Sequence, residues 1–168
     1  EALLQKKKKE GLYDDVHREI LFEEIYLYDS LQRLTTVRQI KSTEINNTLY
    51  KYDKNGNVVQ IKKTRLVQTG KAFTDTLFIE LQKFTYDDSA NLIASENTDS
   101  WGNHKKEINL YNSNGQLIET SVFGDKATLD EKQIYTYSQN GNLTEQKTYD
   151  YIHKSESLTK YIYEYFEN

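Results

Sequence analysis

The sequence contains no cysteine, no proline and no methionine, and only seven glycines among its 168 residues. Without cysteine it can form neither a disulfide nor a thiolate metal site or nucleophile. Because methionine is missing, Glu1 is not a translation start, and a removed signal peptide or a trimmed chain explains this equally well. No segment approaches the ~18 consecutive apolar residues of a transmembrane helix, so no membrane span is expected.

Aliphatic residues are scarce, whereas tyrosine is abundant. Hydrophobic residues make up 36% of the chain, but 14 of them are tyrosines. Counted with glycine and without tyrosine, the apolar share is roughly 32%, against ~45–50% in a typical globular chain. A tyrosine ring buries apolar area while its hydroxyl stays in contact with water. With a mean hydropathy of -0.84, the composition predicts a thin aliphatic core and a sheet with at least one solvated face.

Charge is low and evenly spread, with 22 basic and 26 acidic residues giving a net charge of -4. No basic stripe marks a nucleic-acid surface, so no nucleic-acid partner is expected. The one run of like charge, Lys6–Lys9, is expected to belong to a partly ordered lead-in over residues 1–16, frayed or briefly helical. A polybasic anchor for anionic surfaces is the alternative. The remaining residues, 17–168, are expected to form a single β-hairpin repeat domain.

A nine-residue unit recurs along the chain. Its clearest copy, Tyr50–Val58, reads Tyr-Lys-Tyr-Asp-Lys-Asn-Gly-Asn-Val. Clean copies begin at residues 109 and 135, weaker ones at 26 and 84, and a copy cut off at its turn begins at 161. The tyrosine just before the turn is called the anchor tyrosine, and in the six copies it is Tyr28, Tyr52, Tyr86, Tyr111, Tyr137 and Tyr165.

Each unit carries the chemistry of a β-hairpin turn. Asp53, Asn55 and Gly56 favour a type I turn followed by one left-handed residue. The corresponding turn residues of the clean copies are Asn114, Gly115, Asn140 and Gly141. This three-residue loop predicts that Tyr52 lies opposite Val58.

A two-residue Asn-Gly turn is the competing interpretation, and it would place Tyr52 opposite Val59. That turn needs positive φ at two residues. The weaker copies carry Ser89-Ala90 and Leu31-Gln32 at those positions, where positive φ is costly. The three-residue loop is therefore preferred in every copy.

Sequential hairpins without helices predict an all-β fold, an antiparallel meander of about eleven strands that is twisted and curled toward a barrel. The expected strands lie near 18–28, 34–42, 44–53, 57–66, 76–86, 91–97, 104–111, 116–122, 131–138, 142–149 and 158–166. Longer loops are expected at 67–75, 98–103, 123–130 and 150–157. The last strand lacks its hairpin partner, and we expect this edge to pair with the N-terminal strands, another chain or a continuation.

The units resemble the YD repeats of RHS and teneurin-type proteins, whose pattern centres on Tyr-Asp-x-x-Gly-[Asn or Arg]-Leu. The resemblance covers about residues 26–168 and is closest to short, exported bacterial proteins of this kind. It implies a curled or spiral β-sheet, a location in the periplasm or at the cell surface, and binding of carbohydrate or a protein partner. The Asp-Pro-x-Gly signature of the RHS core cannot occur in a chain without proline, so a self-cleaving toxin shell is not expected.

No constellation of residues points to a metal, a cofactor or catalysis. The segment Asp53–Asn57 resembles the start of a calcium loop, but the sixth and twelfth places hold Val58 and Thr64 instead of Gly and Glu. Neither a Gly-x-Ser-x-Gly elbow nor a phosphate loop occurs. Adjacent carboxylates such as Glu23 and Glu24 would point to opposite faces of a strand. The three histidines are too far apart in sequence to suggest a zinc site: His17, His104 and His153. An enzyme is therefore not expected.

Exposed aromatic residues are the remaining candidates for a site. Trp101, in a polar loop, is expected either to cover the end of the core or to contact a sugar or a protein. Tyrosines at period two pack on a sheet face or form a binding face of rigid amphipathic rings. The candidate ligand-contact residues are Trp101, Tyr50, Tyr52, Tyr135, Tyr137 and Tyr163. The first functional hypothesis is an exported, non-enzymatic module that binds a glycan or a protein, and the second is a structural segment of a longer repeat shell or stalk. The third, and least favoured, is an enzyme whose site is assembled from distant loops.

Overall fold

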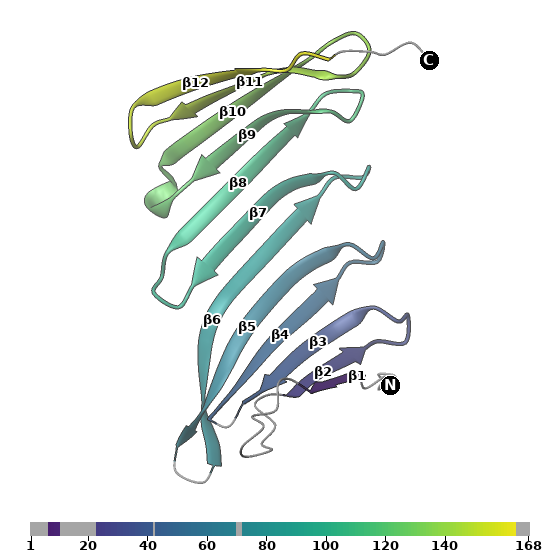
Figure 1. Cartoon of the computed structure of the whole chain (residues 1–168), viewed down its shortest axis with the longest axis vertical. Helices are drawn as coiled ribbons and strands as arrows, with labels where there is room; N and C mark the ends of the chain where they lie inside the picture. The colour runs from purple at the N-terminus through teal and green to yellow at the C-terminus, as the bar shows by residue number, and fades with distance from the viewer. Residues whose placement is uncertain (1–6, 11–22, 42, 70–71, 164–168) are drawn as a thin grey trace. The chain divides into compact units, whose positions relative to one another are not determined.

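The computed structural model describes residues 7–10, 23–41, 43–69 and 72–163. They form twelve β-strands and one short 3-10 turn (Figure 1). The strands are β1 (Lys7–Glu10), β2 (Glu23–Tyr28), β3 (Leu34–Ile40), β4 (Glu44–Tyr52), β5 (Val58–Thr69), β6 (Ala72–Tyr86), β7 (Leu92–Asp99), β8 (His104–Tyr111), β9 (Leu117–Phe123), β10 (Leu129–Tyr137), β11 (Leu143–Asp150) and β12 (Ser155–Lys160), and the 3-10 turn η1 is Asp125–Ala127. None of the described residues forms a helix long and apolar enough to cross a bilayer.

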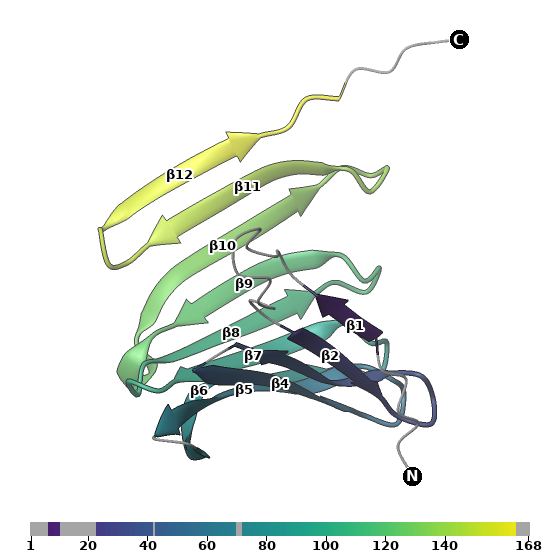
Figure 2. The same cartoon turned by 60° about the horizontal axis from the view of Figure 1, so that its bottom comes forward.

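The strands follow one another in the hydrogen-bonded order β1 to β12, which is also their order in the chain. Neighbouring strands run antiparallel, as in the hairpins β8–β9, β10–β11 and β11–β12 (Figure 2). The expected all-β antiparallel meander is thus confirmed. β1 and β12 stand at the two ends of this order.

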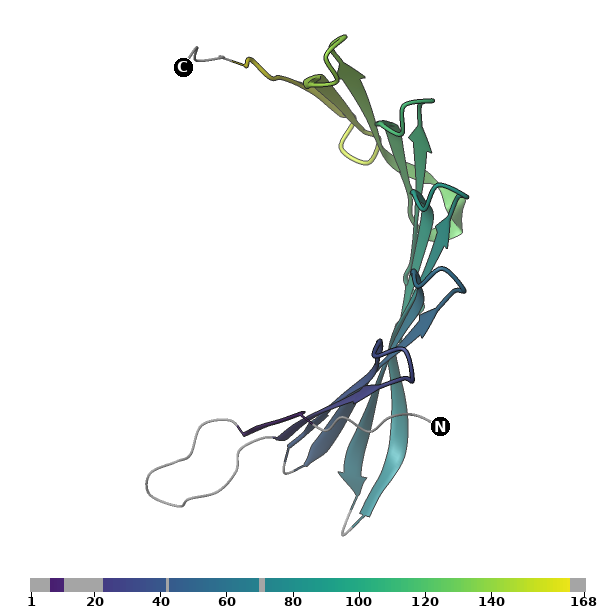
Figure 3. The same cartoon turned by 90° about the vertical axis from the view of Figure 1, so that its right-hand side faces the viewer.

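The chain divides into two compact units, so the domain expected over 17–168 contains parts of both. One unit comprises residues 1–83 and 97–102, and the other comprises residues 84–96 and 103–168. Within each unit the described strands form a single layer, with neither a helix nor a second sheet on their faces (Figure 3). Each unit therefore leaves both faces of its strands without a covering layer of its own.

Burial is correspondingly slight. No hydrophobic side chain of the described residues is buried, and the four buried residues are polar: Asn47, Asn109, Thr120 and Ser121. Asn109 is well satisfied, because its amide donates to the Leu92 carbonyl at 3.2 Å and accepts from the Thr120 hydroxyl at 2.8 Å. The predicted thin core is therefore a sheet of half-buried side chains, stabilised by cross-strand pairs and backbone ladders.

The turns of the five described copies of the unit all use the three-residue loop. In the β4–β5 turn the Gly56 amide donates to the Asp53 carbonyl, and the Asp53 amide donates to the Asn57 carbonyl. Tyr52 pairs with Val58, as predicted, and three further anchor tyrosines pair in the same way: Tyr28 with Leu34, Tyr111 with Leu117 and Tyr137 with Leu143. The turn from Asp87 to Asn91 has the same two backbone hydrogen bonds.

One residue in each of these turns has positive φ: Gln32, Gly56, Ala90, Gly115 and Gly141. The first residue of the turn stabilises it through its side chain. Asp53 Oδ1 accepts from the amides of Asn55 and Asn57, at 2.8 and 2.9 Å. The side chains of Asp29, Asp87 and Asn112 accept equivalent pairs of amide bonds. These are the side-chain-to-backbone bonds expected of Asp and Asn in turns.

A β-bulge lies beside four of the anchor tyrosines. The register shifts by one residue between Lys51 and Tyr52, and equivalent shifts occur at Tyr28, Tyr111 and Tyr137. Two of the residues passed over are Thr35 and Thr144, whose hydroxyls donate to the carbonyls of Leu27 and Thr136. The bulge therefore belongs to the repeated unit, although the sequence pattern gave no sign of it.

The connections between hairpins are shorter than expected. β5 extends to Thr69 and β6 begins at Ala72, and these two residues pair with each other. Most of the loop expected at 67–75 is therefore strand. Register shifts between Lys63 and Thr64 and between Val67 and Gln68 accommodate the length of the extended ladder. The last strand likewise starts early, as β12 begins at Ser155 and ends at Lys160. Residues 164–166 of the strand expected at 158–166 lie outside the described residues.

The lead-in is not helical where it is described. Lys7–Glu10 form β1, which pairs with β2 from Lys7 opposite Tyr26 to Glu10 opposite Glu23. The expectation of a helical turn was wrong at these residues, because pairing with a distant strand overrides local preference. Residues 1–6 and 11–22, which include Lys6 and His17, lie outside the described residues.

Candidate functional site

Three anchor tyrosines form hydrogen bonds to the preceding hairpin. The hydroxyl of Tyr52 donates to the Leu34 carbonyl at 2.7 Å, that of Tyr111 to Leu92 at 3.1 Å, and that of Tyr137 to Leu117 at 2.8 Å. Each acceptor is the first strand residue after the turn of the preceding hairpin. Burial raises the pKa of all three tyrosines. Two of the candidate ligand-contact residues, Tyr52 and Tyr137, therefore link one hairpin to the next.

The other candidates belong to different strands and loops. Tyr50 and Tyr135 are half-buried, and the Tyr135 hydroxyl donates to the Gln133 side chain. Tyr163 is 47% exposed and follows β12. Trp101 is 84% exposed, so the expectation that it covers the end of a core was wrong.

The loop around Trp101 is itself a tight turn. Its first residue, Asp99, accepts from the Trp101 amide through Oδ1 at 2.9 Å and from the Gly102 amide through its carbonyl at 3.2 Å. Gly102 supplies the positive φ of +84°. The turn therefore repeats the chemistry of the hairpin turns and leaves the indole in solvent.

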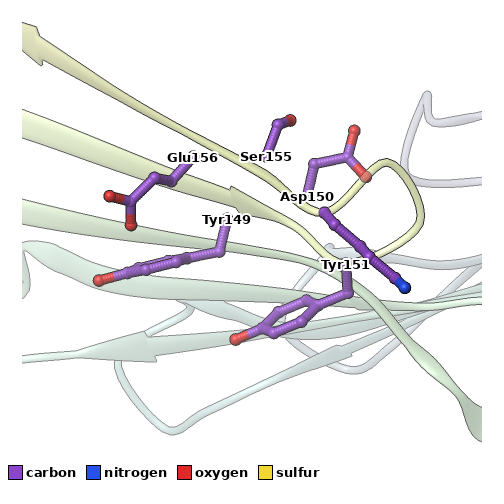
Figure 4. A pocket seen from close by; sticks show the side chains of 6 residues that line it. Tyr149, Asp150, Tyr151, Ser155 and Glu156 are labelled. Carbon is purple, nitrogen blue, oxygen red and sulfur yellow. The ribbon is translucent and has the colours of Figure 1, made fainter.

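A groove at the β11–β12 hairpin brings together residues that the sequence did not single out. It has a volume of about 350 Å³ and is lined by Tyr149, Asp150, Tyr151, Lys154, Ser155 and Glu156. The rings of Tyr149 and Tyr151 are stacked, with centroids 6.5 Å apart and planes 21° apart. In Figure 4 both rings extend to the same side of the strand, and the Glu156 side chain reaches toward that side. We call this feature the tyrosine groove.

Strand register explains why these side chains meet. Tyr149 is the penultimate residue of β11 and pairs with Lys132 on β10 and Glu156 on β12. Residues two apart in a strand share a face, so Tyr151 follows Tyr149 on the same side. The signal in the sequence was the period-two pair in Tyr149-Asp150-Tyr151, which straddles the expected boundary between strand and loop.

Charged groups surround the two rings. The Lys147 ammonium lies 4.7 Å from the centroid of the Tyr149 ring and 3.5 Å from a Glu156 carboxylate oxygen. The Tyr149 side chain, followed by the Glu156 charge, raises the pKa of Lys147. A cation over a tyrosine face is a favourable arrangement, and it holds the Tyr149 ring beside the groove.

The Asp150 carboxylate is hydrogen-bonded within the β11–β12 turn. Its carboxylate accepts from the His153 amide at 2.8 Å and lies 2.7 Å from His153 Nδ1. The hydrogen bond from the His153 backbone, then that from its ring, lowers the pKa of Asp150. Figure 4 shows this carboxylate pointing away from the two tyrosine rings. Glu156 is therefore the carboxylate that the tyrosine groove offers to a ligand.

A second groove, of about 230 Å³, lies beside η1. It is lined by His104, Lys106, Ile108, Phe123, Gly124 and Ala127. The lysine that lines this groove, Lys106, forms an ion pair with Glu96 at 3.1 Å. Lys126 and Ala127 hold consecutive positive φ angles of 63° and 57°. This groove offers an apolar wall with few polar groups, whereas the tyrosine groove offers parallel rings together with a carboxylate and ammonium groups.

Among the residues that the structure describes, no three His, Asp or Glu side chains gather as metal ligands would. His104 lies at the second groove and His153 in the β11–β12 turn.

Comparison with known proteins places the chain in a family. The model of a family described as an uncharacterised protein matches residues 71–168. The chain belongs to this family. The matched residues include the tyrosine groove and both strands that form it. No curated protein matches the chain.

Among solved structures, 27 chains match. One is the crystal structure of TcdB2-TccC3-Cdc42, at 15% identity and a TM-score of 0.36, covering 85% of this chain and 10% of that chain. Another is the Tc holotoxin pore of Photorhabdus luminescens, at 16% identity and a TM-score of 0.36, with the same coverage. A third is TcdB2-TccC3-TEV, at 15% identity and a TM-score of 0.32, covering 91% of this chain and 11% of that chain. The chain thus spans about a tenth of the length of each.

Proposed function

We propose that the chain is a non-enzymatic binding module that uses the tyrosine groove to bind a glycan. The observation that carries the proposal is the stacked pair Tyr149–Tyr151 beside the Glu156 carboxylate. The Tyr151 ring is accessible to a ligand, because it remains 47% exposed.

The chemistry of the groove suits a sugar. A pyranose ring presents C–H groups on one face, and these pack well against the face of a tyrosine ring. Its hydroxyls donate to carboxylates and accept from ammonium groups in charge-assisted hydrogen bonds. Two nearly parallel rings 6.5 Å apart offer adjoining surfaces for neighbouring sugar units, and Glu156 and Lys154 line the same groove.

The two acidic residues of the groove do not suit a hydrolase. Glycoside hydrolysis needs one carboxyl group that stays protonated and one that is free to act as a base or nucleophile. Asp150 has a lowered pKa and is bonded to His153, while Glu156 pairs with Lys147. Binding without turnover is therefore the function that we propose.

We further propose that the chain is a YD-repeat protein exported to the periplasm or the cell surface. Support comes from the recurring turn, in which an anchor tyrosine is followed by Asp, Asn or Ser and each described copy has one residue with positive φ. A protein that binds surface glycans would work on that side of the membrane.

A structural segment of a longer shell or stalk is the second candidate. The observation that favours it is the bond from three anchor hydroxyls, those of Tyr52, Tyr111 and Tyr137, to the preceding hairpin, which would allow hairpins to be added in series. On this view the tyrosine groove would bind nothing.

A glycan array probed with the full chain tests the proposal. We expect a defined set of glycans to bind, and Tyr151→Ala to abolish that binding. Tyr163→Ala is the matched control, because Tyr163 is equally exposed, at 47%, but lies outside the groove. Signals no higher than background for the full chain, or binding that survives in both Tyr149→Ala and Tyr151→Ala, would refute the assignment and favour the structural role.

A further inference from the structure

Among the strands that the structure describes, β12 has one neighbour, its hydrogen-bonded partner β11 (Figure 2). All six residues of β12 are exposed. An edge strand presents unpaired backbone N–H and C=O groups to any strand that approaches it. Bulges and prolines protect many such edges, but β12 pairs with β11 without a register shift, and the chain contains no proline. β12 is therefore regular enough to accept another strand.

The sequence of β12 is complementary to itself. Glu156, Leu158 and Lys160 share one face of the strand, because side chains alternate. When two copies of β12 run antiparallel about a two-fold axis perpendicular to the sheet, residues directly opposite each other share a face. An axis at Leu158 places Glu156 of each copy opposite Lys160 of the other, and the two Leu158 side chains opposite each other. On the second face, Ser157 then lies opposite Thr159.

Neighbouring registers lack this match. Residues directly opposite each other must share a face, so the two-fold axis has to relate a residue to its own copy. The closest alternatives to an axis at Leu158 are therefore axes at Ser157 and at Thr159. An axis at Ser157 places Glu156 opposite Leu158, and an axis at Thr159 places Lys160 opposite Leu158. Opposite charges directly across a pair of strands are stabilising, and among these three registers only the one at Leu158 provides them.

The charges next to β12 extend the pattern. Within one copy, Glu156 lies 3.5 Å from Lys147, and Lys160 lies 3.4 Å from Glu145. The side chains of Glu156 and Lys160 are each 65% exposed in these pairs, so they have room for a second partner. Across the axis each would lie between two groups of opposite charge, and Leu158, which is 52% exposed, would be covered.

We propose that two copies of this chain associate by antiparallel pairing of β12 about an axis at Leu158. The interface is isologous, so one surface on each copy is used twice. This association shares Glu156 with the proposed glycan site, but Tyr149 and Tyr151 lie outside β12, so Tyr151→Ala distinguishes the two proposals.

Sedimentation equilibrium of the full chain over a range of concentrations tests the proposal. We expect a reversible dimer, with a molar mass about twice that of the single chain at the highest concentrations. Glu156→Lys and Lys160→Glu should each give a monomer, because like charges then face each other twice across the axis. An equimolar mixture of the two variants should associate again as a heterodimer, because each introduced charge then faces its opposite.

Two controls separate this result from simple unfolding or altered net charge. Far-UV circular dichroism should be the same for each variant as for the parent chain. Lys54→Glu reverses a charge in the exposed β4–β5 turn and should leave the dimer intact, as should Tyr151→Ala. A parent chain that is monomeric throughout would overturn the proposal and leave the edge to a different strand. Charge variants that dimerise like the parent, or a mixture that stays monomeric, would also overturn it.

Discussion

The hydroxyl of Tyr137 donates a hydrogen bond of 2.8 Å to the carbonyl oxygen of Leu117, twenty residues earlier in the chain. Tyr137 stands just before the turn of its own hairpin, and Leu117 just after the turn of the previous one. The same bond joins Tyr111 to Leu92 and Tyr52 to Leu34. Because no hydrophobic side chain of the described residues is buried, this repeated polar contact is an important link between hairpins.

Removing one of these hydroxyls should therefore weaken the sheet. We expect Tyr137→Phe to lower the free energy of unfolding by about 1 kcal/mol, the usual net value of a hydrogen bond in a protein. Urea unfolding followed by circular dichroism measures it. Tyr50→Phe is the control, since the Tyr50 hydroxyl makes no hydrogen bond within the described part of the chain, and its stability should be unchanged. Equal losses in the two variants would show that the Leu117 contact contributes nothing.

Stability should also fall in strong alkali. Burial raises the pKa of Tyr52, Tyr111 and Tyr137 above the ordinary value of 10.0. A group whose pKa is raised by folding stabilises the protein fully below its unfolded pKa, and this contribution is lost as the pH rises through the folded pKa. The free energy of unfolding should thus decline above about pH 10, and less steeply in Tyr137→Phe. Parallel declines in the two proteins would contradict this prediction.

The left-handed position of the turns can be tested in both directions. Gly115→Ala should destabilise the chain by about 1–2 kcal/mol, because φ is +75° there and no atom lies near enough to a new Cβ to clash. Ala90 occupies the same position of its turn with φ of 62°. Ala90→Gly should stabilise the chain by about 0.5 kcal/mol, after the greater entropy of glycine in the unfolded chain is allowed for. Thermal unfolding of the two variants measures both effects, and a less stable Ala90→Gly variant would contradict the assigned turn.

These turns are also where the sequence was most informative. Asp53 and Gly56 favour a three-residue loop through their local conformational preferences. Ala90 and Gln32 argue against a turn that needs two left-handed residues, so the register of the hairpins could be predicted. The bulge beside Thr35, the pairing of Lys7 with Tyr26 and the extension of β5 to Thr69 depend on the partner strand, which no local pattern specifies. The stacking of Tyr149 on Tyr151 was missed for the same reason, since it requires β11 to continue to Asp150.

The aspartates that begin the turns predict an acid dependence. The side-chain amide of Asn91, followed by its backbone amide, lowers the pKa of Asp87 below the ordinary value of 3.8. A carboxylate with a lowered pKa stabilises the fold above its unfolded pKa, and this contribution is lost as the pH falls through the folded pKa. Asp87→Asn should keep the turn, because Asn112 makes the same amide bonds through its side-chain oxygen. The stability difference between parent and variant should shrink on acidification below pH 3.8, and denaturant unfolding at a series of pH values measures it. A constant difference would contradict the prediction.

Trp101 provides a spectroscopic test of the single-layer sheet. It is the only tryptophan of the chain and is 84% exposed. We expect its fluorescence to match that of free tryptophan in water and to be quenched fully by iodide. Trp101→Ala should change the free energy of unfolding by no more than about 0.5 kcal/mol. Blue-shifted emission that resists iodide would place the indole in a core that this account does not contain.

Titration of the isotope-labelled chain with soluble forms of the glycans that bind on the array, followed by NMR, tests the central claim most directly. The account predicts chemical-shift changes confined to residues 147–156, with the ring resonances of Tyr149 and Tyr151 changing most. Saturable changes centred on Trp101 or on the anchor tyrosines, with the ring signals of Tyr149 and Tyr151 unmoved, would contradict it.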